Sequence, residues 1–388
     1  MTAAAELNRQ DATRPLPDGW RWVRIGEVCD IVQGEALPLT EFKPVGYPVY
    51  GANGRIGCYT RYHYEEPQVL VTCRGATCAT INLSEPKSYV TNNSMAMLPK
   101  DANQLERQYL RWVLDGGVAK SAISGSAQPQ ITRASLSPIR IPLPSLSEQK
   151  RIAGILRSQM AAVERARRSA EAQLQAAEAL PAAHLRAVFN SPEAQQWPKK
   201  RFGNICEIVA KQVDPRVPEY GALPHVNGEN IESGRCRLSY LNTAAEEGMI
   251  SGKYLFESGD VLYSKLRPYL RKVCVVDFRG VCSADMYPIR VNRDYLDPHF
   301  TAWLLVSDEF TEYADEESRR ARMPKLNRDQ LFAWDTPLPS LSDQRRIASQ
   351  FSAQMASAER LRQTLAEQLD AINKLPAALL RRAFSGEL

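Results

Sequence analysis

The stretch PLPSLSEQKRIAGILRSQM (Pro142 to Met160) returns 195 positions later, without a gap, as PLPSLSDQRRIASQFSAQM (Pro337 to Met355). Twelve of the nineteen aligned positions are identical, where unrelated stretches would share roughly one. The same displacement carries LPAAHLRAVF (180–189) onto LPAALLRRAF (375–384). The chain is therefore an internal duplication.

A second repeated segment opens each copy. WRWVRIGEVCDIV (20–32) matches WPKKRFGNICEIV (197–209) at a displacement of 177 positions. Because the displacement grows from 177 to 195 along each copy, the second variable region holds 18 additional residues. We expect an N-terminal tail at 1–18, a first variable domain at 19–146 followed by a long helix at 147–190, and a second variable domain at 191–341. A second long helix and the C-terminal tail follow at 342–388.

Both repeated closing segments show helical periodicity. Apolar residues recur at steps of three and four, with charged residues between them. The expected seam is Ile152, Leu156, Val163 and Leu174 in the first copy, and Ile347, Phe351, Leu361, Leu365 and Ile372 in the second. We predict N-caps at Ser147 and Ser342, and a kink at Pro181 and Pro376 that leaves a separate short turn after each proline.

One such helix would ordinarily pack on its own domain, but two equivalent helices in one chain can pair with each other. We therefore predict an α+β fold in which the two variable domains are separated by an antiparallel coiled coil with pseudo-twofold internal symmetry. Helices are expected at 105–115 and 297–307. β-rich segments such as QVLVTC, GDVLYS and KVCVV are expected to form short strands.

The composition excludes several classes of protein. Of 388 residues, 44% are hydrophobic and 24% charged, which is typical of a globular chain with two or three domains. The N-terminal residues lack the apolar core of a signal peptide and no apolar run could cross a bilayer, so we expect a cytoplasmic protein. The eight cysteines form no CxxC pair, which indicates reduced thiols and no metal site. The net charge of +5 favours polyanions only mildly.

The order of these motifs resembles the DNA-specificity subunits of Type I restriction-modification systems over essentially the whole chain. Supporting patterns are PVYGANGRIGCY (48–59), VLVTCRGATC (69–78), SGSAQPQITR (124–133), FESGDVLYSKLRPYLRKV (256–273) and RMPKLNRDQL (322–331). The resemblance implies that each domain reads one half of an interrupted DNA target. It further implies that the helices set the spacing and dock two methyltransferase subunits, to which restriction endonuclease subunits are added. S-adenosylmethionine, ATP and Mg would belong to those partners, with no cofactor or metal in this chain.

The residue pattern itself points to DNA contacts in both variable regions. Basic residues interleave with tyrosines between Val261 and Tyr295, and a second cluster surrounds Met323 and Pro324. Asn and Arg on the turn at 50–55, and Gln and Arg at 128–133, suit adenine and guanine edges. The candidates are Asn53, Arg55, Arg74, Gln128, Gln130 and Arg133 in the first domain, and Lys265, Arg267, Arg271, Lys272, Arg319, Arg320, Arg322 and Lys325 in the second. Exposed loops without function would have the same composition.

No catalytic motif is recognisable in the chain. It holds no GxxxxGK[ST] loop, no NPPY-type tetrapeptide and no carboxylate and lysine set of a metal-dependent nuclease. We therefore predict a non-catalytic subunit. Two alternatives remain: an adaptor that binds only proteins through its helices, and an enzyme with an unfamiliar active site.

Overall fold

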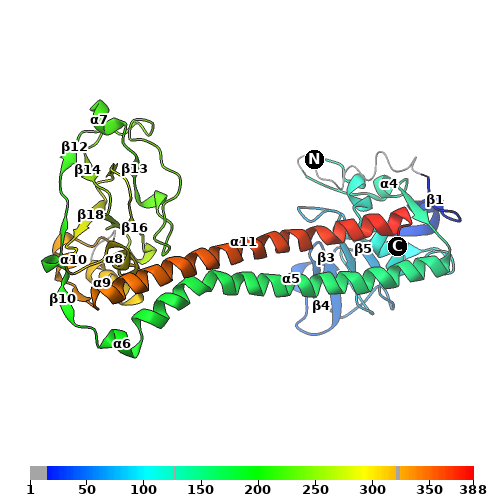
Figure 1. The fold of residues 1–388 in the computed structure, drawn as a ribbon. Helices are drawn as coiled ribbons and strands as arrows, with labels where there is room; N and C mark the ends of the chain where they lie inside the picture. Colours follow the sequence, from blue (N-terminus) through cyan, green and yellow to red (C-terminus); the bar gives the residue numbers. More distant parts are fainter. Residues whose placement is uncertain (1–14, 126–127, 320–323) are drawn as a thin grey trace. The chain divides into compact units, whose positions relative to one another are not determined.

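The computed structural model describes residues 15–125, 128–319 and 324–388 (Figure 1). The chain divides into two compact units. Unit 1 comprises Met1–Ala170 together with Gln368–Leu388, and unit 2 comprises Glu171–Glu367. Unit 1 therefore contains the first described residues together with the end of the chain.

The described part of unit 1 has three small sheets. A two-stranded sheet pairs β1 with β9, a four-stranded antiparallel sheet has the order β2-β8-β5-β6, and a three-stranded sheet has the order β4-β3-β7. The strands are β1 (Arg21–Arg24), β2 (Cys29–Gln33), β3 (Tyr47–Gly51), β4 (Gly54–Tyr59), β5 (Val69–Thr72), β6 (Ile81–Leu83), β7 (Tyr89–Val90), β8 (Ser94–Pro99) and β9 (Arg140–Leu143). The short helices are α2 (Ile25–Val28), α3 (Arg107–Asp115) and α4 (Arg133–Leu136).

Unit 2 repeats this plan with one enlarged sheet. Strands β10 and β19 pair, and the four-stranded sheets have the orders β11-β18-β15-β16 and β12-β14-β17-β13. The strands are β10 (Lys199–Arg201), β11 (Cys206–Ile208), β12 (Gln212–Val213), β13 (His225–Val226), β14 (Lys253–Phe256), β15 (Val261–Ser264), β16 (Val273–Val275), β17 (Gly280–Cys282), β18 (Met286–Val291) and β19 (Asp335–Pro337). The short helices are α6 (Pro192–Gln195), α7 (Pro218–Gly221), α8 (Pro298–Leu305), α9 (Asp308–Ser318) and α10 (Arg328–Ala333).

The strand register shows where the two copies diverge. Val69 faces Met97 in unit 1, and Val261 faces Ile289 in unit 2, so both partners are displaced by 192 positions. The displacement is 177 at β2 and β11, which means that 15 of the 18 additional residues fall between β11 and β15. The enlarged sheet β12-β14-β17-β13 is built mostly from this region.

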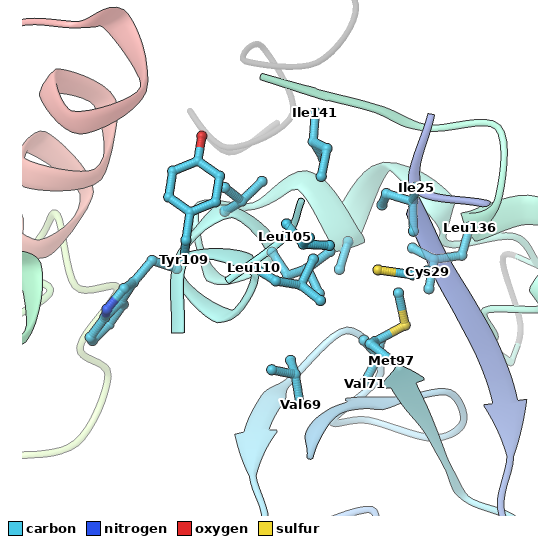
Figure 2. Close-up of a cluster of buried hydrophobic side chains, with 14 of the residues drawn as sticks. Ile25, Cys29, Val69, Val71, Met97, Leu105, Tyr109, Leu110, Leu136 and Ile141 are labelled. Atoms are coloured by element: carbon cyan, nitrogen blue, oxygen red, sulfur yellow. The ribbon is translucent and has the colours of Figure 1, made fainter. Parts of the chain in front are cut away.

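A hydrophobic core fills each unit because its strands and α3 or α8 are apolar on the inward face. Figure 2 shows part of the unit 1 core, where side chains of β5, β8 and α3 meet those of α2 and α4. The Tyr109 hydroxyl, inside this core, donates to the carbonyl of Pro142 at 2.8 Å, so the ring is buried without leaving its hydroxyl unpaired. The predicted helices at 105–115 and 297–307 and the three predicted strands are confirmed.

Two long helices complete both cores. The first turns of α5 (Leu146–Phe189) and the last turns of α11 (Leu341–Ser385) pack in the core of unit 1. The last turns of α5 and the first turns of α11 pack in the core of unit 2, where the rings of Phe189 and Phe351 stack at 5.6 Å. Each helix thus begins on one unit and ends on the other, so the two run in opposite directions. The predicted fold class is confirmed.

Two details of the helix prediction were wrong. Both helices continue through their prolines, Pro181 and Pro376, so no separate turn follows; the kink at each proline stays a prediction. The serines that cap the two helices lie two residues earlier than the predicted Ser147 and Ser342. The Ser145 and Ser340 hydroxyls accept hydrogen bonds from the amides of residues 148 and 343. The helices therefore start at Leu146 and Leu341, directly after these serines.

Burial varies along the predicted seam, and the contact between the two helices at these residues stays a prediction. Ile152, Leu156, Ile347, Phe351 and Leu365 are buried, whereas Val163, Leu174 and Ile372 are half-buried. Leu361 is 44% exposed, the largest exposure among the predicted seam residues. Leu361 follows Ala358 by three residues and precedes Leu365 by four, which is the spacing of one apolar stripe, so helical phase does not account for its exposure.

No helix in the described ranges is both long enough and apolar enough to cross a membrane.

Candidate nucleic-acid interface

In unit 1, the end of β5 pairs through its backbone with the segment that leads into α4. We call this short pairing the crossing. The amide of Ile131 donates to the carbonyl of Cys73 at 2.9 Å, and Arg74 and Gln130 form an antiparallel bridge. Ile131 is 3% exposed and anchors the crossing in the core. The crossing leaves Arg74, Gln130 and Arg133 exposed on adjacent turns.

The tip of the β3–β4 hairpin is hydrogen-bonded to the end of β5 and to the loop that follows it. The hydroxyls of Thr72 and Thr77 both donate to the carbonyl of Ala52, at 3.1 and 3.0 Å. Gly54 has φ +75°, which permits the tight turn between β3 and β4. Asn53 is therefore held, exposed, beside the end of β5.

Arg55 differs from Asn53 because its side chain makes hydrogen bonds within the protein. Its guanidinium donates to the carboxylate of Glu85 at 3.1 Å and to the sulfur of Cys58 at 3.6 Å. The structure thus gathers Asn53, Arg74, Gln130 and Arg133 around one crossing and gives Arg55 a neutralising neighbour. Gln128 is exposed on the same loop.

Unit 2 repeats the crossing bond for bond. The amide of Leu326 donates to the carbonyl of Lys265 at 3.0 Å, and Leu266 bridges Lys325. The strand-end amide also has an equivalent partner, since Cys73 donates to Asn93 and Lys265 donates to Asp285. Leu326 is fully buried in the place of Ile131.

Three of the predicted cations in unit 2 are engaged inside the protein. Lys265 is 8% exposed, and its ammonium donates to the carbonyl of Ala284. Arg271 pairs with Asp308 at 2.7 Å, and Lys272 donates to the carbonyl of Ile231 at 2.5 Å. These contacts give the three side chains a structural role, and their contact with DNA stays a prediction.

Other predicted cations in unit 2 point outward. Arg267 is exposed and has φ +50°, and its amide donates to Pro324 at 2.9 Å, next to the crossing. Lys325 and Arg319 are also exposed. Arg320 and Arg322 lie outside the described residues.

Several charged residues near the crossing of unit 2 interact with Lys265. Burial lowers the pKa of Lys265, and the neighbouring charge of Lys325 lowers it further, with a smaller contribution from Arg328. Asp285 opposes this shift at 4.0 Å from the Lys265 ammonium. The charges of Lys325 and Arg328 therefore act on Lys265, and Asp285 partly offsets them.

A buried glutamine joins each long helix to its unit, and our sequence analysis missed it. The side chain of Gln149 accepts from the amide of Glu106 at 2.8 Å and donates to the carbonyls of Gln104 and Pro144, both at 2.9 Å. Gln344 makes the same three bonds, to Asp297, Tyr295 and Pro339. Both glutamines are fully buried. The signal was present, because both occupy the same place in PLPSLSEQ and PLPSLSDQ.

A loop in unit 2 links the crossing to α11. The amide of Gly234 donates to the carbonyl of Arg271, and the hydroxyl of Ser233 donates to the carbonyl of Leu270. Next to them Arg235 pairs with Glu359 of α11 at 2.5 Å. A groove of about 410 Å³ lies beside this ion pair. The loop comes from the region with additional residues, so the sequence repeat could not predict it.

The described residues show no metal centre. No group of three His, Cys, Asp or Glu side chains among them could hold an ion. All eight cysteines are free thiols, and burial raises the pKa of Cys73 and Cys78, which disfavours the thiolate.

Comparisons with known proteins agree on one family. Residues 17–173 match the family model described as Type I restriction modification DNA specificity domain. The Type I restriction enzyme EcoDI specificity subunit of Escherichia coli is 26% identical over 407 residues, which cover 96% of this chain and 89% of that protein.

Solved structures show the same fold. The HsdS subunit from Thermoanaerobacter tengcongensis superimposes with a TM-score of 0.62 at 22% identity, covering 97% of this chain and 99% of that one. A chain from a structure of complex assembly and conformational transition of the type I R-M system gives a TM-score of 0.71 at 22% identity, covering 96% of this chain and all of the other.

Proposed function

We propose that this chain, which is similar to Type I restriction-modification specificity subunits, recognises a bipartite DNA sequence, with one half read by each unit. The observation that carries this proposal is the duplicated crossing. Two units with diverged loops keep the same backbone frame and expose cationic and amide side chains on it. Two equivalent readers in one chain suit a target with two separate halves.

We assign the second part of the proposed function to the long helices. Each begins in the core of one unit and ends in the core of the other, so a change in helix length would change where the second unit meets DNA. We assign the spacing between the half-sites to α5 and α11. Two methyltransferase subunits would dock on these helices and on adjacent domain surfaces.

Catalysis is assigned to the partners in this proposal. The methyltransferase subunits would bind S-adenosylmethionine, and restriction endonuclease subunits would use ATP and Mg. The role of this chain is to hold those subunits at a chosen sequence, through its exposed cations and amides.

An exchange of recognition segments tests the proposal. Residues 48–133 would be replaced by the matching region of a relative with another specificity, and methylated adenines would be mapped in a host that expresses the methyltransferase subunits. One half of the methylated motif should change and the other half should stay. A change in both halves, or in neither, would contradict the two-reader model.

A control separates DNA binding from a role as a protein adaptor. The purified chain should shift the mobility of duplex DNA, with an affinity that falls steeply as salt rises. An adaptor that binds only proteins would give no shift at any salt concentration.

A further inference from the structure

The two crossings can be compared position by position because their backbones match. At a displacement of 195 residues, QPQITR (128–133) aligns with MPKLNR (323–328). The arginine that closes each segment is the same, Arg133 or Arg328, whereas the bridge position before it changes from Gln130 to Lys325. The opposite bridge position changes from Arg74 to Leu266.

The frame holds both arginines in equivalent places. Each follows a residue in a reciprocal cap: Thr132 exchanges bonds with Ser135, at 3.0 and 3.1 Å, and Asn327 exchanges bonds with Gln330, both at 2.9 Å. Leu136 and Leu331, next in order, are fully buried. The arginine backbones are therefore fixed while their side chains stay exposed.

Neither arginine has a structural task that explains its identity. Within the described ranges, no hydrogen bond or ion pair involves the side chain of Arg133 or Arg328. This contrasts with Arg271, which is neutralised by Asp308 at 2.7 Å. An exposed cation retained in both copies without a protein partner is suited to an external anion.

Resting on the proposed function, we infer that Arg133 and Arg328 are equivalent contacts to DNA phosphate, and that the bridge positions beside them discriminate bases. The physical reason is that two half-sites share one backbone chemistry but differ in their bases. Residues that read the backbone can stay identical in both units. Residues that read bases must differ, as Gln130 differs from Lys325 and Arg74 from Leu266.

The side chains at the bridge positions have the required chemistry. Glutamine can pair with the N6 and N7 of adenine, and arginine or lysine with the O6 and N7 of guanine. Leucine offers only an apolar contact, such as that with the thymine methyl group. Unit 1 thus presents Arg74 and Gln130 at the place where unit 2 presents Leu266 and Lys325.

The first experiment measures the dependence of affinity on salt. The full chain and its Arg133→Gln, Arg328→Gln and double variants would bind a fluorescein-labelled duplex between 50 and 300 mM salt, followed by anisotropy. Each substitution should lower the slope of log K against log salt by about 0.9, and the double variant by about twice that. Arg→Lys variants keep the charge and should keep the slope.

A matched control uses another repeated pair of arginines. Arg165 and Arg360 are also related by 195 positions and are exposed, but they lie on the long helices. The Arg165→Gln plus Arg360→Gln variant has the same charge change and should keep the wild-type slope. An equal loss in this control would show that the effect reflects net charge alone and would overturn the inference.

The second experiment separates phosphate contact from base reading. With the methyltransferase subunits, Gln130→Lys should change one half of the methylated motif, whereas Arg133→Gln should reduce methylation evenly at all sites without changing the motif. A motif altered by Arg133→Gln, or unchanged slopes in variants that fold and bind, would overturn the inference. A wild-type chain that fails to bind DNA would instead refute the proposed function.

Discussion

The repeated glutamine allows a quantitative test of how each recognition unit is attached to its helix. Replacing Gln149 by leucine keeps the side-chain size but removes three hydrogen bonds in a fully buried place. The amide of Glu106 and the carbonyls of Gln104 and Pro144 lose their partner. A typical hydrogen bond contributes about 1 kcal/mol net, and a buried unsatisfied group costs about 1 to 3 kcal/mol.

Adding these terms and allowing for the apolar gain of leucine, we expect Gln149→Leu to lower the free energy of unfolding by about 3 kcal/mol. For a unit of this size the melting temperature should fall by roughly 6 to 12 °C. The loss should be confined to unit 1, because all three bonds lie there. Gln344→Leu should produce the same loss in unit 2.

The assay is calorimetry combined with hydrogen–deuterium exchange read by mass spectrometry. Gln149→Leu should accelerate exchange in α3, whose N-terminus receives the glutamine, and leave α8 unchanged. Gln159→Leu is the control on the same helix. The buried side-chain oxygen of Gln159 has no hydrogen-bond partner among the described residues, so its removal should not destabilise the chain. If Gln149→Leu melts like the wild type, or loosens both units equally, the reasoning fails.

Four further predictions follow from the structure. Arg235→Ala should accelerate exchange at 231–237 while costing about 0.5 kcal/mol, because Glu359 keeps Arg362 as a partner in a partly exposed pair; unchanged exchange would refute the link to α11. Arg362, more than Arg235, lowers the pKa of Glu359 to about 2 from the ordinary 4.5, so its stabilisation is present above pH 4.5 and is lost as the pH falls towards 2. The free energy of unfolding of Glu359→Gln, measured by acid titration, should therefore change less with pH between 4.5 and 2 than that of the wild type. Arg267→Ala should reduce the salt slope of DNA binding by about one unit, whereas Lys272→Ala should mainly lower the melting temperature because its ammonium holds the Ile231 carbonyl; the opposite pattern would reverse their roles. Four residues inserted after Leu174 add about 6 Å of helix, and methylation mapping should find a spacer longer by about one or two base pairs, unless the methyltransferase subunits set the spacing.

The sequence by itself determined the architecture. The duplicated segments, the apolar steps of three and four and the short β-rich runs predicted two α+β domains and two long paired helices, and these are observed. Such patterns are readable because period and repetition are local properties of a chain. The same repeats contained the buried glutamine, but its structural role became visible only when the fold showed its three hydrogen-bond partners.

The tertiary structure decided which polar side chains remain available. Lys265, Arg271 and Lys272 read as a basic cluster, yet their partners Ala284, Asp308 and Ile231 lie 19 to 41 positions away along the chain. Tertiary structure also left Leu361 exposed and showed that Ser145 and Ser340 are the residues that cap the long helices. A cation's role depends on whether folding brings an acceptor within about 3 Å of it, and that distance is set by the packing of segments remote in sequence.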